Sequence, residues 1–276
     1  MTGAGNDFIL IDKKLNPEFE ISTDIIVKIC DRHFGIGADG VLLFDDDINS
    51  SFKLNYYNSD GSTGNLCGNG ARCAVNYAYS KKMFDADRIS FLSNNKLYSA
   101  EMLASNIVKF YLNAPQKVKM NFMVKAFNQL IKASYVNTGA PHLVLNCNGI
   151  LKKPNDLNSK FDSLAELPVI ELGKELRYHK DFLPDGVNVN FILIDKDVIK
   201  IRTYERGVEN ETLACGTGSV ASAISVFLNN NIKPPIKLIA ISGAELIVDF
   251  NYVNNNFENI SLTGPAQIVY NGEFII

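Results

Sequence analysis

The feature that most constrains this chain is a pattern of residues that occurs twice. A Cys-Gly-x-Gly motif stands at residues 67–70 and again at 215–218. Two other short motifs precede both copies in the same order: Asp-Gly-Val at 39–41 and 185–187, and Thr-Gly-Ala at 2–4 and 138–140. Three ordered matches at similar spacings indicate an internal duplication. Because this spacing is far longer than a solenoid repeat, the sequence predicts two similar domains that face each other.

Length and composition agree with two domains. A chain of 276 residues is long enough for two domains of ordinary size. Its hydrophobic residues, 46% of the total, can supply a core in each half. The turn-like Asn-Ala-Pro at 113–115 marks the expected end of the first half.

Most of the chain has the pattern of short β-strands. Strand-like runs occur at 9–11, 41–44, 52–57 and 89–92. We expect one hairpin where Ser-Asn-Asn-Lys at 93–96 follows the last of these runs. We expect a second hairpin near the C-terminal end, because Asn271-Gly272 separates two apolar runs and both residues tolerate a positive φ.

Few helices interrupt these strands. One helix is expected at 24–31, and the two clearest, at 71–79 and 219–228, directly follow the Cys-Gly-x-Gly motifs. The segment 219–228 is apolar on nearly all sides, which predicts a helix buried inside a sheet or barrel. The sequence therefore places each motif at the start of a helix.

Each motif also places a cysteine, Cys67 or Cys215, just before its helix. The first N–H groups of a helix have no partner within the helix, so they can hold a substrate carboxylate. The same helix end favours a thiolate over a thiol by about 0.3–1 kcal/mol, and by up to ~2 kcal/mol where it is partly buried. Two thiolates in one dry pocket would repel each other, so we expect one thiolate and one thiol.

A thiolate and a thiol suit the inversion of a carbon stereocentre. The thiolate removes the α-proton from one face, and the thiol delivers a proton to the opposite face. Donors aimed at the carboxylate in a closed site would stabilise the developing negative charge. A pyridoxal enzyme would instead need a lysine Schiff base in a phosphate-binding context, which we do not find in the sequence. We therefore expect an amino-acid racemase or epimerase that uses no cofactor.

The remaining cysteines are expected to be small buried hydrophobic residues: Cys30, Cys73 and Cys147. The total of five is odd, which argues against a disulfide framework. No Cys-x-x-Cys pair occurs and the chain has only three histidines, so we expect no metal site. The acidic run at 45–47 is expected to be a turn after a strand.

Charge and hydropathy exclude several kinds of partner. The net charge is −3 and no run of Lys and Arg forms a stripe, so we expect no nucleic-acid binding. No apolar stretch approaches the ~20 residues that span a bilayer, and the N-terminus does not have the pattern of a signal peptide. We therefore expect no membrane association and a cytoplasmic location. The Gly-x-Gly-x-x-Gly string at 35–40 precedes a strand, whereas a dinucleotide-binding string follows one.

Several motifs together carry a family resemblance. They are Gly-Asn-Asp-Phe at 5–8, Asn-Ser-Asp-Gly at 58–61, Cys-Gly-Asn-Gly-Ala-Arg-Cys at 67–73, Tyr-Glu-Arg-Gly at 204–207 and Ala-Cys-Gly-Thr-Gly at 214–218. With these motifs the chain resembles the diaminopimelate epimerase family from Gly3 to Tyr270. The resemblance implies an α+β fold of two similar domains related by pseudo-two-fold symmetry, each a β-barrel-like sheet around a central helix. It also implies that the last strand returns to the first domain, so we expect domains of residues 1–115 with 264–276 and of residues 116–263.

The resemblance further implies an activity and a set of site residues. The activity is the two-base epimerisation of LL-2,6-diaminopimelate to meso-diaminopimelate, in lysine and peptidoglycan-precursor synthesis. Cys67 and Cys215 match the catalytic pair. Positions that match substrate-binding residues are Asn6, Asn58, Gly68, Asn69, Asn188, Glu205, Arg206, Gly216 and Thr217. His142 and Glu205 match positions that tune the cysteines, and Tyr270 matches a dimer contact, so we expect a homodimer.

The chain departs from the family pattern in three places. Gly40 stands where many relatives have a side-chain amide that contacts substrate, and Ala140 stands where many have a binding asparagine. Met1 falls only two residues before Gly3, so we expect a short first strand or a shortened start. Two alternatives stay open: a proline or hydroxyproline racemase on the same scaffold, and a non-enzymatic thiol-redox protein.

Overall fold

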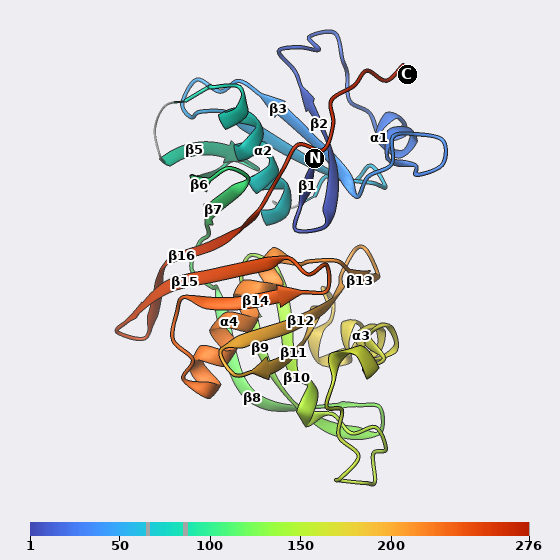
Figure 1. Ribbon diagram of the computed structural model, residues 1–276. Coiled ribbons are helices and arrows are strands. Elements are labelled where there is room, and N and C mark those ends of the chain that lie inside the picture. The colour runs from blue at the N-terminus through green and yellow to red at the C-terminus, as the bar shows by residue number, and fades with distance from the viewer. Residues whose placement is uncertain (65–66, 85–87, 276) are drawn as a thin grey trace. The chain divides into compact units, whose positions relative to one another are not determined.

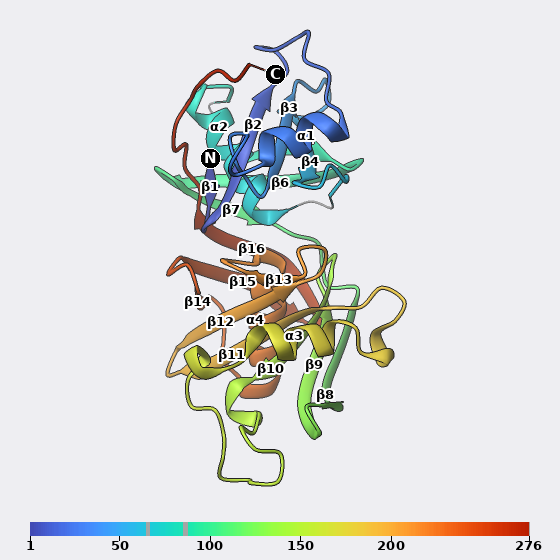
Figure 2. The same ribbon diagram turned by 90° about the vertical axis from the view of Figure 1, so that its right-hand side faces the viewer.

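The computed structural model describes residues 1–64, 67–84 and 88–275 (Figures 1 and 2). The chain forms two compact units. One consists of Met1–Tyr111 with Thr263–Ile276, and the other of Leu112–Leu262. Each unit combines many strands with few helices, which confirms the α+β class expected from the sequence.

Among its described residues, the first unit has seven strands that pair in chain order. They are β1 (Thr2–Gly3), β2 (Asn6–Asp12), β3 (Gly40–Asp45), β4 (Lys53–Asn58), β5 (Arg88–Ser93), β6 (Lys96–Ala104) and β7 (Ile107–Tyr111). The runs that the sequence singled out fall within these strands or, at Phe52, one residue before one. The expected hairpin is β5 with β6, and Asn94 and Asn95 between them have φ values of 48° and 58°.

The second unit is built in the same manner. Its strands are β8 (Lys117–Ala126), β9 (Gln129–Asn137), β10 (Pro141–Asn146), β11 (Asn188–Asp195), β12 (Val198–Glu205), β13 (Asn210–Thr212), β14 (Ile236–Ala240), β15 (Glu245–Val253) and β16 (Asn256–Pro265), the last of which runs past the end of the unit. They pair in the order β8-β9-β10-β11-β12-β14-β15-β16, and β13 lies beside β12.

The same series of strand pairs occurs in both units. In the first, β2 and β3 are parallel, β3 and β4 antiparallel, β4 and β5 parallel, and β5 and β6 antiparallel. In the second, β10, β11, β12, β14 and β15 repeat that series. A helix follows the first strand of each parallel pair: α1 (Thr23–Cys30) and α2 (Gly68–Ser80), then α3 (Val169–Arg177) and α4 (Gly216–Asn230). This repeated topology confirms the two similar domains that the duplicated motifs predicted.

The helices α2 and α4 each lie among the strands of their own unit (Figure 1). α2 contacts β1, β2, β3, β4, β6 and β7, and α4 contacts β8, β9, β10, β11, β14 and β15. Small residues on these helices allow the strands to approach closely; at Gly70 an added Cβ would lie 2.8 Å from Leu42 Cδ2. The buried helix expected at 219–228 is therefore confirmed.

The C-terminal hairpin expected around Asn271-Gly272 is not formed. In the described chain, no strand follows β16. The apolar side chains there are exposed: Val269 by 58%, Tyr270 by 62% and Ile275 by 94%. Two short strands with so little apolar surface to bury would be marginal in water, so the Asn-Gly signal alone does not produce a hairpin.

The sequence did not predict α3. Its buried residues Val169, Leu172 and Leu176 recur at the spacing of an amphipathic helix. Gly173, however, lowers the helix propensity of the segment. Glycine is required there because an added Cβ would lie 2.5 Å from the Cβ of Tyr204, so the close packing that holds α3 also weakens its signal in the sequence.

We expect the burial of α4 to make a large contribution to stability. Ile224 on this helix is fully buried, so Ile224→Ala should lower the free energy of unfolding by about 2–5 kcal/mol through lost burial and a residual cavity. Urea unfolding followed by circular dichroism measures this change. Ile48→Ala, at a position 97% exposed, is the matched control and should change stability by less than about 0.5 kcal/mol. Equal losses in the two variants would contradict a packed helix.

Candidate active site

The two cysteines of the duplicated motif occupy the same position in the two units. Cys67 is the N-cap residue of α2 and Cys215 is the N-cap residue of α4, both with extended backbone. Cys67 is partly exposed, and Cys215 is 8% exposed. Gly68, Asn69 and Gly216 in the first turns are buried, so the helix N–H groups that could bind a carboxylate are held away from bulk water.

The sulfur of Cys215 accepts a hydrogen bond from the backbone of its own helix and contacts the hydroxyl of Thr217, where either group can donate. The N–H of Gly218 lies 3.4 Å from Cys215 Sγ, and the hydroxyl of Thr217 lies 3.6 Å from it. Gly218 has to be glycine, because an added Cβ would lie 2.2 Å from Asn190 Oδ1 and 3.2 Å from Cys215 Sγ. The second Cys-Gly-x-Gly motif thus holds its sulfur at the helix start and leaves room for a neighbour on β11.

His142, on β10, contacts this helix start through Thr217. Its Nε2 lies 3.0 Å from Thr217 Oγ1, and its Nδ1 lies 3.2 Å from Asn190 Nδ2. Burial, together with the positive charge of Arg206, lowers the pKa of His142 to about 3. The imidazole is therefore neutral at pH 7.

Three further expected site residues lie where β11 begins and β12 ends. Asn188 Nδ2 donates to Pro141 O at 3.0 Å, and Asn188 Oδ1 accepts from the backbone N–H of Arg206 at 2.9 Å. Glu205 accepts a hydrogen bond from Thr212 Oγ1 at 2.5 Å. The guanidinium of Arg206 donates to Asp185 O at 3.2 Å. Asn188 therefore joins the two strand ends that carry these groups.

In the first unit, the corresponding helix start is linked to Asn6. Asn69 Nδ2 donates to Asn6 Oδ1 at 2.7 Å, and Asn69 Oδ1 accepts from Arg72 at 2.8 Å. Arg72 is fully buried, and its Nε and one Nη have no hydrogen-bond partner among the described residues. Burial lowers the pKa of Arg72 to about 10, against the opposing effects of Cys73 and Cys67, so it remains a cation at pH 7.

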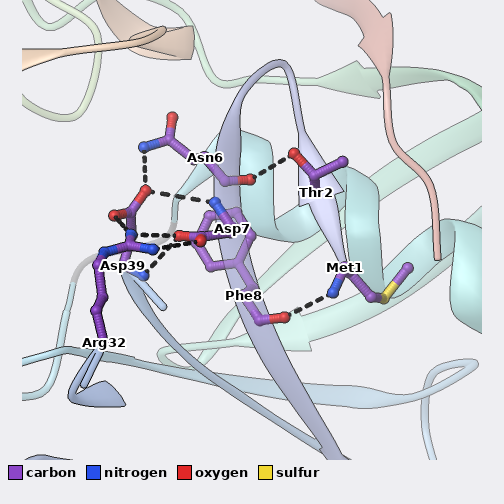
Figure 3. Close-up of polar contacts among 7 residues, drawn as sticks. All are labelled: Met1, Thr2, Asn6, Asp7, Phe8, Arg32 and Asp39. Atoms are coloured by element: carbon purple, nitrogen blue, oxygen red, sulfur yellow. Dashed lines mark hydrogen bonds and ion pairs between the residues drawn. The ribbon is translucent and has the colours of Figure 1, made fainter. Parts of the chain in front are cut away.

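The other end of Asn6 is held by charged groups near the surface (Figure 3). Asn6 Nδ2 donates to Asp39 Oδ2 at 2.9 Å. Arg32 joins Asp39 to Asp7 through three hydrogen bonds of 2.8 Å, two of them to the carboxylate of Asp7. A carboxylate thus fixes one end of the Asn6 amide, and Asn69 with the buried guanidinium of Arg72 fixes the other.

The first unit contains two of the departures from the family pattern, Gly40 and the short first strand. An added Cβ at Gly40 would lie 2.4 Å from Tyr57 O and 2.7 Å from the ring of Tyr56, so this chain cannot carry a side-chain amide there without a backbone shift. Asn58, at the end of β4, donates to Ser62 Oγ at 2.9 Å. The short first strand is β1, of two residues, and it pairs with β2 and with Gln267.

The other cysteines are buried, as expected. Burial is the main cause that raises the pKa of Cys30 and Cys147 to about 11 and of Cys73 to about 12, so these three remain thiols. No disulfide joins any of the five cysteines in the described chain.

The described residues contain neither a group that could hold a metal ion nor a helix that could span a membrane. No group of three acidic, histidine or cysteine residues could hold a metal ion in residues 1–64, 67–84 and 88–275. Across the same residues, no helix is long and apolar enough to cross a bilayer. Tyr270, expected at a dimer contact, lies on the exposed C-terminal segment.

Sequence reasoning assigned no role to Arg72, Asp39 or Asn190, although all three contact expected site residues. Arg72 and Asp39 stand inside motifs that the sequence singled out, at 67–73 and 39–41. Arg72 could have been assigned to the site because it stands near Cys67 in the chain, and Asp39 because it is part of the repeated Asp-Gly-Val motif. Asn190 stands outside every motif, two residues after Asn188, and only the pairing of β10 with β11 brings it to His142.

Solved structures of other proteins share this fold. It matches a phenazine biosynthesis protein of the PhzF family from Bacillus anthracis with a TM-score of 0.67 and 12% identity, over 96% of this chain and 92% of that one. It also matches a hydroxyproline epimerase from Agrobacterium vitis with a TM-score of 0.64 and 15% identity, over 87% of this chain and 77% of that one. At this level of identity the matches define the fold class alone: two similar units, each with a helix that begins after a cysteine.

Within this class, the chain belongs to the diaminopimelate epimerase family. The model of that family, described as diaminopimelate epimerase, matches residues 1–118 and 134–269. The diaminopimelate epimerase of Aquifex aeolicus is 35% identical over 284 residues, which cover 99% of this chain and 95% of that protein. The diaminopimelate epimerase of Chlorobaculum tepidum is 36% identical over 275 residues, covering 99% and 98%. The family resemblance carried by the sequence motifs is confirmed.

The ion pairs around Asn6 should give the stability of the protein a specific dependence on acid. Burial acts to raise the pKa of Asp7, but the hydrogen bonds and charge of Arg32 outweigh it, so the pKa of Asp7 lies below its usual value. A lowered pKa in the folded state adds stability that is present above the unfolded pKa of ~3.9 and is lost as pH falls through the folded value.

We therefore expect Asp7→Asn to destabilise the protein by about 1 kcal/mol at pH 7, and by less at pH 3, because pH 3 lies below the unfolded pKa of ~3.9 and part of the stability from the lowered pKa is lost there. Urea unfolding at the two pH values measures the difference. Asp46→Asn, which removes an exposed carboxylate paired with Lys14, is the control. A loss that is the same at both pH values would show that Asp7 acts through packing alone.

Proposed function

We propose that the chain interconverts LL-2,6-diaminopimelate and meso-diaminopimelate by a two-base mechanism without a cofactor. The family membership supports the substrate. The single observation that carries the mechanism is the equivalent position of Cys67 and Cys215, each the N-cap of a buried helix. The setting we propose is lysine and peptidoglycan-precursor synthesis in the cytoplasm.

In this proposal the two sulfurs act on one substrate carbon. One sulfur, as thiolate, takes the α-proton, and the other, as thiol, gives a proton to the opposite face. The charge passes from the first sulfur to the second, so the enzyme is then ready for the reverse direction. The pKa of each of the other three cysteines is raised by burial to about 11 or 12, which leaves them as thiols unsuited to this role.

The α-carboxylate of the substrate would bind at the helix starts. A helix binds an anion through the backbone N–H groups of its first turn. In this chain those groups belong to Gly68 and Asn69 of α2 and to Gly216 and Thr217 of α4. Negative charge that develops as the α-proton leaves would be stabilised by these fixed donors. This role accounts for glycine at the first turn of both helices.

The distal end of the substrate carries a second carboxylate and a second ammonium group. Arg206 offers a planar fork of donors for the carboxylate, and Glu205 can accept from the ammonium. Asn6, Asn58 and Asn188 would supply neutral hydrogen bonds. A monocarboxylate such as proline would leave Arg206 without its partner, so the proposal favours the dicarboxylate. We further propose a homodimer that includes Tyr270 in its contact.

The two-base scheme is tested with serine variants. Cys67→Ser and Cys215→Ser should each lower kcat for LL-diaminopimelate by at least about a thousand-fold, because a serine hydroxyl is a far weaker acid than a thiol. Incubation in deuterated water should show label at the inverted carbon for the wild type only. Cys30→Ala, which removes a buried thiol outside the site, is the matched control and should retain its rate. Near-normal turnover in either serine variant would rule out the scheme.

The substrate is tested through the distal carboxylate. Arg206→Gln should raise KM for diaminopimelate by roughly ten- to a hundred-fold, since it removes a hydrogen-bonded charge pair. Arg88→Gln, a change at an exposed arginine of β5, should leave KM unchanged. Wild-type turnover of proline or hydroxyproline, without turnover of diaminopimelate, would overturn the substrate and retain the racemase chemistry.

A further inference from the structure

We infer that Asn190 is a positioning residue: it holds His142 in the tautomer with its proton on Nε2, so that hydrogen bonds converge on Cys215, the thiolate of the resting enzyme. This inference rests on the proposed function, because it assigns the two protonation states that the two-base scheme requires. It concerns residues of the second unit only.

The amide of Asn190 has one fixed orientation. Asn190 is fully buried on β11. Its Nδ2 donates to the backbone carbonyl of Leu143 at 3.0 Å, and a carbonyl can only accept. Its Oδ1 accepts from Thr203 Oγ1 at 3.0 Å. The nitrogen end of the amide is therefore fixed by chemistry, and a flipped amide would set two oxygens against each other.

The amide of Asn190 determines the tautomer of His142. The second hydrogen of Asn190 Nδ2 points to His142 Nδ1, at 3.2 Å. An amide nitrogen donates and does not accept, so Nδ1 must carry the lone pair. In a neutral imidazole the proton is then on Nε2. Neutrality follows from burial and from Arg206, the charged group that acts on this ring from the end of β12, which together lower the pKa of His142 to about 3.

Thr217 connects the Nε2–H donor of His142 to the sulfur of Cys215. His142 Nε2–H donates to Thr217 Oγ1 at 3.0 Å, so the hydroxyl hydrogen of Thr217 is left to point away from the ring. Cys215 Sγ lies 3.6 Å from the same oxygen and also receives the N–H of Gly218 at 3.4 Å. Two donors and the helix start all favour negative charge on this sulfur.

The corresponding position in the first unit holds a different group. Asn69 stands where the second unit has Thr217, and its amide bonds to Asn6 and to Arg72. The side chain of Asn69 has no hydroxyl that could accept from an imidazole and donate to a sulfur, as Thr217 does in the second unit. If only one sulfur is charged at rest and that sulfur is Cys215, Cys67 carries the proton and acts as the acid in the first turnover.

Nuclear magnetic resonance of protein labelled with ¹⁵N-histidine tests the tautomer directly. The chain has three histidines, and His142→Gln identifies the signals of His142. We expect the Nε2–H pattern for this ring at pH 7 and at pH 5. In Asn190→Asp, a carboxylate faces Nδ1, so we expect the single proton of the neutral ring to move to Nδ1. A wild-type His142 with its proton on Nδ1 would overturn the inference.

The charge on Cys215 is tested in the Cys67→Ser background. The rate at which iodoacetamide alkylates Cys215, located by mass spectrometry, reports the thiolate. We expect Asn190→Asp to slow this reaction at pH 7 by about ten-fold and Asn190→Leu to slow it by about three- to five-fold. Thr203→Val removes the other hydrogen bond of the amide and retains the bond to Leu143, so it is the matched control and should alkylate at the parent rate.

The two Asn190 variants keep the test decisive if one of them does not fold, and circular dichroism of each shows whether it does. Folded variants that alkylate at the parent rate would overturn the inference. Neither measurement needs turnover. A wild type with the expected tautomer and alkylation rate but no activity toward diaminopimelate would therefore count against the proposed function alone.

Discussion

The first N–H groups of a helix have no partner inside that helix, and in this chain two such helix starts are buried, at Gly68 of α2 and Gly216 of α4. Each is preceded by a cysteine as N-cap, a residue whose sulfur accepts hydrogen bonds only weakly unless it is ionised. Burying a helix with this cap is costly unless negative charge is available there. The strands that bury α2 and α4 therefore fix one point in each unit at which an anion is favoured.

The two units meet this preference with different polar groups. In the first, a buried guanidinium, Arg72, reaches the first turn of the helix through Asn69, and near-surface carboxylates fix the far end of Asn6. In the second, a neutral imidazole, His142, acts through a hydroxyl. The duplication kept the order of strands and helices and replaced the polar residues around the sulfur. Two halves with one topology can thus hold one cysteine charged and the other protonated.

The sequence predicted those parts of the molecule that local rules determine. Periodicity found α1, α2, α4 and most strands of the first unit, and the repeated motifs found the two equivalent domains. It failed where long-range contacts decide. α3 carries a glycine for packing against Tyr204, and the Asn-Gly near the C-terminus lacks neighbours that would bury its flanks. At the site, motif residues were found because they stand together in the chain. Asn190 was not, because its partners His142, Leu143 and Thr203 lie on β10 and β12, the two strands that flank β11.

The close approach of Gly218 to Asn190 ties the helix to the strand beside it. A methyl group on residue 218 would lie 2.2 Å from the amide oxygen of Asn190, so the two positions share one volume. A homologue with a larger residue at 218 would have to carry a smaller one at 190, and would then lose the amide that faces the imidazole. Paired changes at these two positions should therefore separate family members with an amide-held histidine from those that hold it by other means.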